Sequence, residues 1–141
     1  MKFRKFGDNY VINIESGEEL MSCLQGLARN EKIVGARVQG IGSLEDVQLG
    51  FHLPDKERYH KQFFTGQFDL ISLMGNISYD GEKNRAFVHV HAVIGDNEFR
   101  TFAGHMLSAK VLSTAELFVT VVGEAIPSVP DGAGGANPWQ L

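Results

Sequence analysis

The feature that most constrains this chain is the succession of strand-like segments that follows residue 30. In residues 87–95, "FVHVHAVIG", apolar side chains occupy every second position, as in a strand with one buried face: Val88, Val90, Ala92 and Ile94. Turn-forming runs such as "DGEKN", residues 80–84, separate segments of this kind. Because strands satisfy their backbone polar groups by pairing, the sequence predicts a sheet of seven or eight strands, mostly antiparallel.

One helix is expected ahead of most of these strands. Residues 10–14, "YVINI", alternate as a strand does, and Ser16 then stands three residues before Glu19. That spacing is typical of a capping box, in which two side chains satisfy free N–H groups at a helix start. Apolar residues then recur at helical spacing: Leu20, Leu24, Leu27 and Ala28. The pattern predicts one main helix over residues 17–30 and an α+β fold for the whole chain.

Glycines interrupt several of the strand-like segments. Residues 60–80, "HKQFFTGQFDLISLMGNISYD", are interpreted as two strands broken near Gly66, and residues 107–112, "LSAKVL", as one helical turn. The run "GIGSLE", residues 40–45, resembles a dinucleotide-binding loop, but Glu45 stands where the third glycine is required. The long helix also precedes this strand, whereas in that motif it follows. We interpret the glycines as a bend that lets the strand pass close to a neighbour.

The bulk composition excludes several classes of protein. A length of 141 residues with 43% apolar residues fits one domain with a real core. No apolar run is long enough to span a membrane, and no segment resembles a signal peptide. The single cysteine, Cys23, excludes a disulfide framework, so we expect a cytoplasmic protein. We divide the chain into a domain over residues 1–125 and a Pro- and Gly-rich tail over residues 126–141, in which Trp139 is a candidate anchor.

Three of the five histidines lie within one predicted hairpin. His89 and His91 face the same way because they are two residues apart on a strand. If "DNE" forms a three-residue loop, Gly95 pairs with Phe99 and His105 falls directly opposite His89. A two-residue loop would instead turn His105 to the other face. Ala103 and Gly104 leave room beside the imidazoles.

Three imidazoles on one such patch can converge on a divalent ion at the distance of about 2.0–2.1 Å that zinc requires. An H-x-H pair alone on a strand is more often two partly exposed polar side chains than a metal site. With the third histidine opposite, metal binding and partly exposed polar side chains are about equally plausible. We therefore predict a site for zinc, or another divalent transition metal, formed by His89, His91 and His105. His52 and His60 lie on other predicted strands and are interpreted as surface residues.

Two charged residues are candidates for a catalytic role beside that ion. Glu116 interrupts the apolar strand "TAELF", and a carboxylate there needs a partner. Arg100 is one candidate partner and a candidate clamp for a small anionic or carbonyl-bearing ligand. Strand alternation directs Arg100 away from the face of His105 unless a bulge intervenes. The alternative for Glu116 is a surface carboxylate or one that is paired for structural reasons.

The order of several motifs resembles that of the plant- and prokaryote-conserved (PPC) domain family over residues 8–124. The resemblance is carried by "GEEL", "GIGSL", "GQFDLISLMGNIS", "HVHAVI", "AGHML" and "TAEL", in that order. One departure is Ala103, where the family usually has glycine. The resemblance implies a highly twisted, largely antiparallel sheet in an α/β domain that assembles as a homotrimer. It also implies the free-standing prokaryotic form, since the basic AT-hook element of the plant proteins is absent here.

The resemblance supports two functions of different kinds. The family's prokaryotic members are labelled DNA-binding, which implies a regulatory module that contacts DNA or protein partners. The net charge of −4 and the absence of a basic run in this chain do not support DNA binding. The fold is also similar to that of acetolactate decarboxylase, a zinc enzyme whose metal is held by an H-x-H pair and a later histidine. That similarity places His89, His91 and His105 at the metal and implies, as the alternative, a metal-dependent enzyme or small-molecule sensor.

Overall fold

A computed structural model describes residues 1–53, 58–129 and 137–141 and shows one helix with six strands in a single sheet. In chain order the elements are β1 (Lys2–Phe6), β2 (Asn9–Glu15), α1 (Leu20–Asn30), β3 (Ala36–Leu53), β4 (Arg58–Asp80), β5 (Arg85–Gly95) and β6 (Thr101–Val121). All the strand pairs are antiparallel. The prediction of a mostly antiparallel sheet with one main helix is confirmed, although the strands are fewer and longer than the predicted seven or eight.

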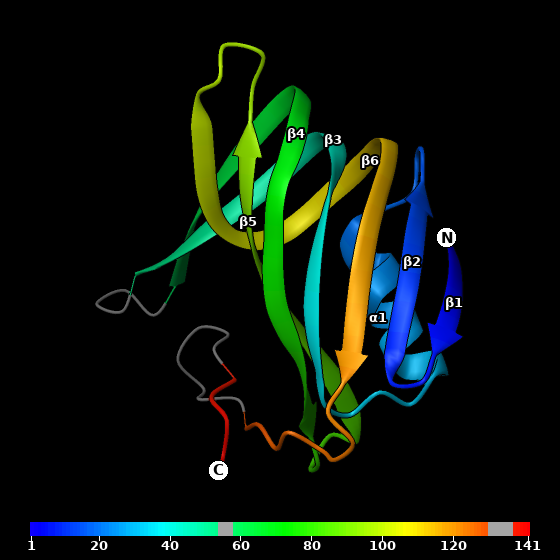
Figure 1. Ribbon diagram of the computed structural model, residues 1–141. Helices are drawn as coiled ribbons and strands as arrows, with labels where there is room; N and C mark the ends of the chain where they lie inside the picture. The colour runs from blue at the N-terminus through cyan, green and yellow to red at the C-terminus, as the bar shows by residue number, and fades with distance from the viewer. Residues whose placement is uncertain (54–57, 130–136) are drawn as a thin grey trace.

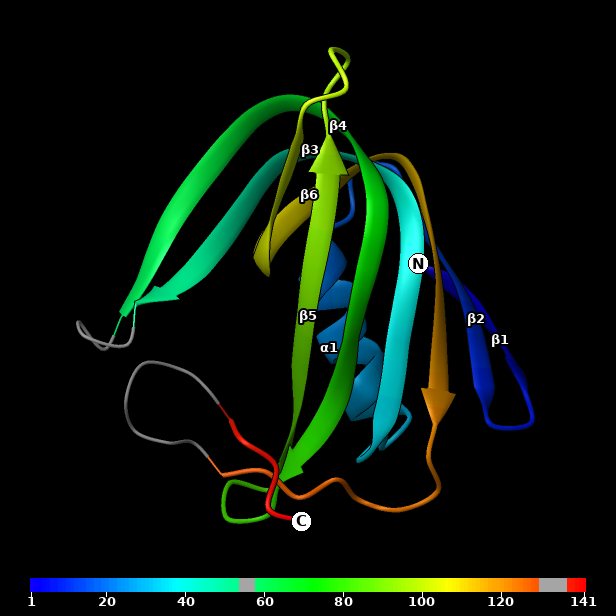
Figure 2. The same ribbon diagram turned by 60° about the vertical axis from the view of Figure 1, so that its left-hand side comes forward.

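The strands follow the order β1-β2-β6-β3-β4-β5, and β5 also pairs with β6. The strands β3, β4, β5 and β6 are therefore linked in a closed cycle of pairings. The long strands bend near their middle (Figures 1 and 2), so that the start of β6 reaches β5 while its end lies between β2 and β3. The start of β6 pairs with the end of β5 as a hairpin, and the three histidines lie on this hairpin. The bend then carries the rest of β6 to its place between β2 and β3.

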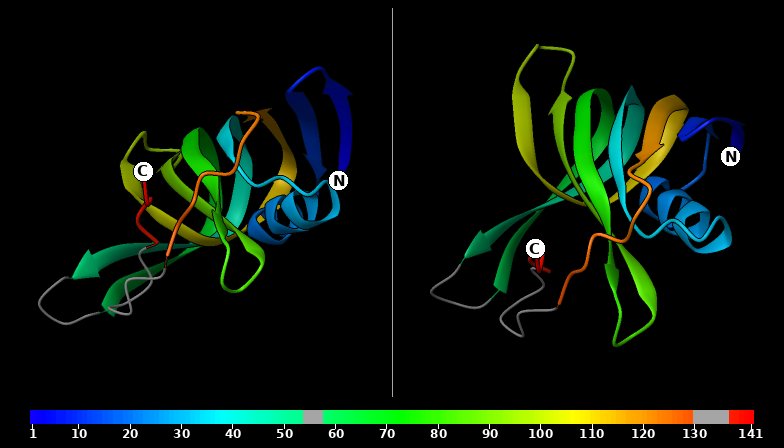
Figure 3. Two further views of the ribbon diagram at one scale, coloured as in Figure 1. Left: turned by 90° about the horizontal axis from the view of Figure 1, so that it is seen from below. Right: turned by 60° about the horizontal axis from the view of Figure 1, so that its bottom comes forward.

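The helix α1 lies on one side of the sheet and packs against β5 and β6 (Figure 3). Its buried residues are Leu20, Met21, Leu24, Leu27 and Ala28. They meet the inward-facing residues of the strands, among them Ile14, Val38, Val90 and Val119, in one apolar cluster. The outer face of the sheet has no helix against it in the described part of the chain.

The predicted start of the helix is wrong. The helix begins at Leu20 and not at residue 17, and its N-cap is Glu19, whose carboxylate accepts hydrogen bonds from the N–H groups of Met21 and Ser22. Ser16 does not cap it, because its hydroxyl donates to the carbonyl of Leu112 on β6. The chain turns at Gly17, with φ of 85°, and this turn holds Ser16 against β6 instead of at the helix end.

Two predicted interruptions are strand in the structure. β4 continues through Gly66, whose φ of 105° permits a sharp local change of direction that does not end the strand. Residues 107–112 belong to β6 and form no helical turn. The interpretation of Gly40 and Gly42 is confirmed, since a Cβ at Gly42 would lie 2.7 Å from the Cα of Ala115. The pairing of β3 with β4 is irregular between these two glycines, whereas its pairing with β6 is regular there.

Residues 122–129, which follow β6, run below the ends of the strands (Figures 1 and 2). Pro127 bridges to Tyr79 at the end of β4, and Ser128 pairs with Trp139 within the predicted tail itself. An anchoring role for Trp139 stays a prediction. The rest of the predicted tail, residues 130–136, lies outside the described residues. Within the described chain, no helix has the length and apolar character needed to cross a membrane.

Candidate metal centre

The three predicted metal ligands converge on the outer face of β5 and β6. His89 and His91 lie on β5, and His105 lies directly opposite His91 in the antiparallel pair. The loop between the strands therefore holds five residues, 96–100, and not three as predicted, so the register differs by two positions. A shift of two residues leaves every side chain on its expected face, which is why the wrong loop length still gave the right cluster.

The distances among the imidazole rings fit a single bound ion. The Nε2 atoms of His89 and His91 are 3.2 Å apart, and one nitrogen from each of the three rings lies within 4.8 Å of the others. Two imidazole nitrogens on a tetrahedral zinc, each about 2.05 Å from it, are about 3.3 Å apart. The first pair already has that spacing. The ring of His105, whose centroid lies 4.9 Å from that of His89, must move only slightly to complete the set.

The surroundings of His89 and His105 favour the neutral form of their imidazoles. Burial, followed by repulsion from His89 and His91, lowers the pKa of His105 from its ordinary value of 6.5 to about 4. Burial also lowers the pKa of His89, with repulsion from His91 as the second cause. Metal ions bind the neutral imidazole, so a lowered pKa leaves the nitrogens ready to bind a cation at neutral pH. No described acidic residue is among the groups that converge here.

A cavity of about 580 Å³ opens beside the cluster. Besides the histidines it is lined by Gly50, Phe51, His52, Ala103 and Gly104, so β3 contributes one wall. Gly50 pairs with His105, and a Cβ at Gly104 would lie 3.0 Å from the carbonyl oxygen of Gly50. The glycine therefore allows β3 to pass close to the ligands, and Ala103 leaves the cavity uncrowded, as expected from the sequence.

The comparisons with known proteins agree with the sequence motifs. Residues 1–123 match the model of the Plants and Prokaryotes Conserved domain, abbreviated PCC or PPC. The chain belongs to the PPC domain family. A PPC protein from Pyrococcus horikoshii is 32% identical in sequence, with 99% of this chain and 95% of that one covered and a TM-score of 0.86. No curated protein matches the sequence.

Two further solved structures carry descriptions that bear on function. A Bacteroides thetaiotaomicron protein described as a "putative dna binding protein" is 27% identical, with 99% and 96% coverage and a TM-score of 0.92. The protein AF0104 from Archaeoglobus fulgidus, described as metal-containing, is 26% identical, with both chains fully covered and a TM-score of 0.84. The PPC fold of this chain is thus shared over its whole length with proteins described in both ways.

Glu116 and Arg100 do not line the histidine cavity of this PPC domain. Glu116 lies near the far end of β6, where it pairs with Asn13 and Ile41 and faces two other cavities. Arg100 lies in the loop after β5 and forms ion pairs with Asp96 at 2.7 Å and Glu98 at 3.1 Å. Two carboxylates already neutralise the charge that an anion clamp would need.

The sequence interpretation missed two residues of the cavity wall. Phe51 and His52 both line it, although His52 was interpreted as a surface residue. His52 stands two positions from Gly50, so it faces the same way as the residue opposite His105. The position of His52 beside the histidine cluster depends on the register between β3 and β6. These strands are far apart in the sequence, so no local sequence pattern predicts that position.

Proposed function

We propose that this PPC domain protein binds one divalent transition metal ion, zinc in the first place, through His89, His91 and His105. The observation that carries the proposal is the convergence of the three imidazoles, with two Nε2 atoms 3.2 Å apart. Sites built from imidazoles alone suit zinc, but they also suit copper, nickel or iron. We choose zinc because it is often held by three histidines. The description of AF0104 as metal-containing supports the same assignment.

The residues present fit a metal with an exchangeable ligand. Three protein ligands leave a fourth position of a tetrahedral ion open, and the cavity lies beside them. Neutral imidazoles leave the full positive charge of the ion, which when bound acts as a Lewis acid toward a carbonyl or anionic oxygen. Phe51 supplies an apolar wall and His52 a polar group close to that position. These features support a second candidate function, recognition or conversion of a small anionic or carbonyl-bearing molecule at the ion.

The protein is further proposed to act as a homotrimer, as the family resemblance implies. The exposed apolar residues on the outer face of the sheet support assembly, since large exposed apolar surfaces mark interfaces. DNA is a candidate partner because the similar Bacteroides thetaiotaomicron protein is described as a "putative dna binding protein". The negative net charge speaks against strong DNA binding by this chain. The single cysteine is consistent with a cytoplasmic role.

Elemental analysis of protein purified without an affinity tag tests the metal proposal. We expect about one metal ion per chain in the wild type, and none in the variant with His89→Ala and His91→Ala, because one imidazole does not hold the ion. His60→Ala is the matched control, since His60 is exposed on β4 and does not line the cavity. Stoichiometric metal in the double variant, or a wild type that takes up no zinc on titration, would show the proposal wrong.

A further inference from the structure

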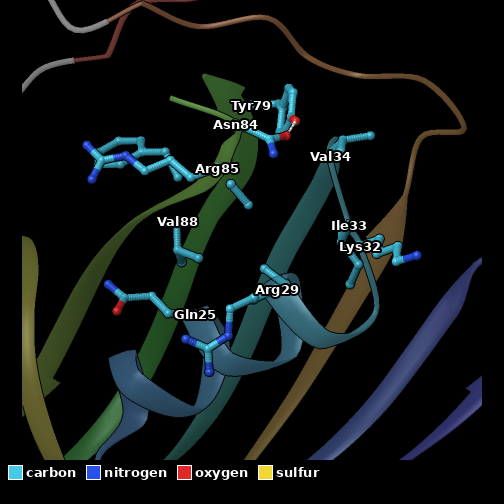
Figure 4. Close-up of a pocket in the computed structure, with 12 residues that line it drawn as sticks. Gln25, Arg29, Lys32, Ile33, Val34, Tyr79, Asn84, Arg85 and Val88 are labelled. Carbon is cyan, nitrogen blue, oxygen red and sulfur yellow. Dashed lines mark hydrogen bonds between the residues drawn. The ribbon is translucent and has the colours of Figure 1, made fainter. Parts of the chain in front are cut away.

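A second cavity lies on the other side of the sheet, between the end of α1 and the start of β5. Its volume is about 830 Å³, within the range of small-molecule sites. Figure 4 shows its lining residues, which come from α1, the loop after it, the end of β4 and the start of β5. Its floor is apolar and buried, formed by Ala28, Ile33 and Val88. None of the histidines lines it.

Three permanent positive charges surround this cavity. Arg29 comes from the last turn of α1, Lys32 from the loop after it and Arg85 from the start of β5. No acidic residue is among the described residues that line the cavity. Within residues 1–53, 58–129 and 137–141, none of the three forms an ion pair. A chain with a net charge of −4 thus gathers around one apolar floor three cations that form no ion pair with any described residue.

Two carboxylates that lie close to these residues in the chain, Glu31 and Asp80, have other partners. Glu31 accepts a hydrogen bond from the Tyr10 hydroxyl at 3.1 Å. Asp80 is buried, accepts from the N–H of Lys83 and lies 4.0 Å from the ammonium of the same residue. Arg29 is well placed to stabilise the negative end of the helix dipole, but this accounts for neither Lys32 nor Arg85. Among the described residues neither these two carboxylates nor the exposed Glu82 forms an ion pair with the three cations, whose charge is therefore available to a ligand.

We propose that this cavity binds a small organic phosphate, a molecule with an apolar or aromatic body and a phosphate group. A phosphate monoester carries nearly two negative charges at neutral pH and offers three acceptor oxygens, which suits two guanidinium groups and one ammonium. The apolar body rests on Ala28, Ile33 and Val88. In Figure 4 the charged ends of Arg29, Lys32 and Arg85 point away from one another. All three side chains are exposed, and exposed side chains change rotamer within nanoseconds, so on this proposal they turn inward when an anion supplies the counter-charge.

Binding of phenyl phosphate and of adenosine monophosphate to metal-free protein at low ionic strength tests this proposal. Isothermal titration should give an affinity at least about tenfold higher for either probe than for inorganic phosphate, phenol or adenosine, because only the probes engage both charge and floor. Arg29→Gln and Arg85→Gln should each weaken binding about tenfold, since each removes a charge-assisted hydrogen bond. Affinity should fall steeply as salt is added.

Two matched variants distinguish binding in this cavity from binding elsewhere on the protein. Arg4→Gln removes the same charge from β1, at the opposite edge of the sheet from β5, and should leave the affinity unchanged. The variant with His89→Ala and His91→Ala should also bind normally, so failure of the metal site does not affect the result. Four results would overturn the proposal. Arg4→Gln could weaken probe binding as much as the cavity variants do, or the histidine variant could lose probe binding. The probes could also bind no more tightly than inorganic phosphate, or not at all at millimolar concentration. Unchanged thermal melting of the arginine variants confirms that they fold.

Discussion

At the scale of single residues, the pKa of His105 lies far below its ordinary value. This residue is partly buried at the start of β6, and burial together with the two other imidazoles holds its pKa at about 4. In the unfolded chain the same group has a pKa of about 6.5. Between these values the unfolded state binds more protons than the folded state, and that difference makes stability depend on pH.

We therefore expect the free energy of unfolding of the metal-free protein to fall as the pH is lowered from 6.5 toward 4. The contribution is fully present above pH 6.5, because the imidazole is then neutral in both states. Allowing for solvent screening at a partly exposed ring, the loss should be about 1–2 kcal/mol. Urea unfolding at pH 7.5 and pH 4.5 measures it. His105→Gln should show a smaller decline than the wild type and than His60→Gln, and an equal decline in all three would contradict the assignment.

The sequence predicted the histidine cluster well because strand alternation is insensitive to an error of two residues. His89 and His91 face together in any register, and His105 joins them whenever the loop has an odd number of residues. The environment of Glu116 could not be predicted in the same way. The cavity that a residue near the far end of β6 lines depends on how this strand bends. The bend in turn depends on the pairing of β6 with β2 and β3.

At the scale of elements, close contacts between strands depend on glycine. Gly75 on β4 faces Val90 on β5, and a Cβ at Gly75 would lie 2.0 Å from the carbonyl oxygen of His89 and 2.6 Å from the Cα of Val90. Both atoms are backbone, so they move only if β5 moves. The two strands can approach this closely only because residue 75 has no side chain.

Gly75→Ala should therefore destabilise the protein by at least about 2 kcal/mol, the cost typical of forcing atoms into a packed site. It should also weaken metal binding, since β5 carries His89 and His91. Gly26→Ala is the matched control: no atom lies within 4 Å of the added Cβ, and alanine in a helix is favoured by about 0.5–1 kcal/mol over glycine. Thermal unfolding measures both changes. A Gly75→Ala variant as stable as the wild type would contradict the close approach.

The same elements show where sequence patterns fail. Gly66 and the "LSAKVL" segment indicated interruptions of the strands that contain them. β4 and β6 nevertheless continue through these positions, because both strands pair with β3 on either side of them. The capping box failed for a related reason: hydrogen bonds to β6 take Ser16 away from the helix end, and Glu19 replaces it. Local propensity was overridden in each case by a partner strand distant in sequence.

At the scale of the whole molecule, charge limits what the protein binds. With a net charge of −4 we expect only weak, non-specific association with duplex DNA, which disappears as salt rises toward physiological concentration. Fluorescence anisotropy with random and defined duplexes at several salt concentrations measures this. Sequence-preferring binding with nanomolar affinity at physiological salt would show the expectation wrong and would favour the regulatory function over the metal-dependent one.

One row of exposed side chains crosses the outer face of the sheet and reaches the histidine cluster. Successive strand pairs align Val11, Phe118, Gln39, Met74 and His91 across β2, β6, β3, β4 and β5. The three apolar members are well exposed, Met74 to 62% and Phe118 to 47%. One helix shields the inner face only, so this outer face is the surface that a second copy of the chain would cover.

We expect the protein to form a homotrimer through this face at micromolar concentration, the number of subunits being that implied by the family resemblance. Phe118→Lys and Met74→Lys should each dissociate it, because a charge buried in an apolar contact without a partner costs several kcal/mol. Phe99→Lys is the control, since Phe99 lies in the loop after β5 and is 92% exposed there. Sedimentation velocity distinguishes the mass of a monomer from that of a trimer.

A wild-type protein that sediments as a monomer refutes assembly. A trimer that survives both substitutions places the interface on another surface. Because the row ends at His91, dissociation should also lower the metal content per chain, which elemental analysis of the two variants measures.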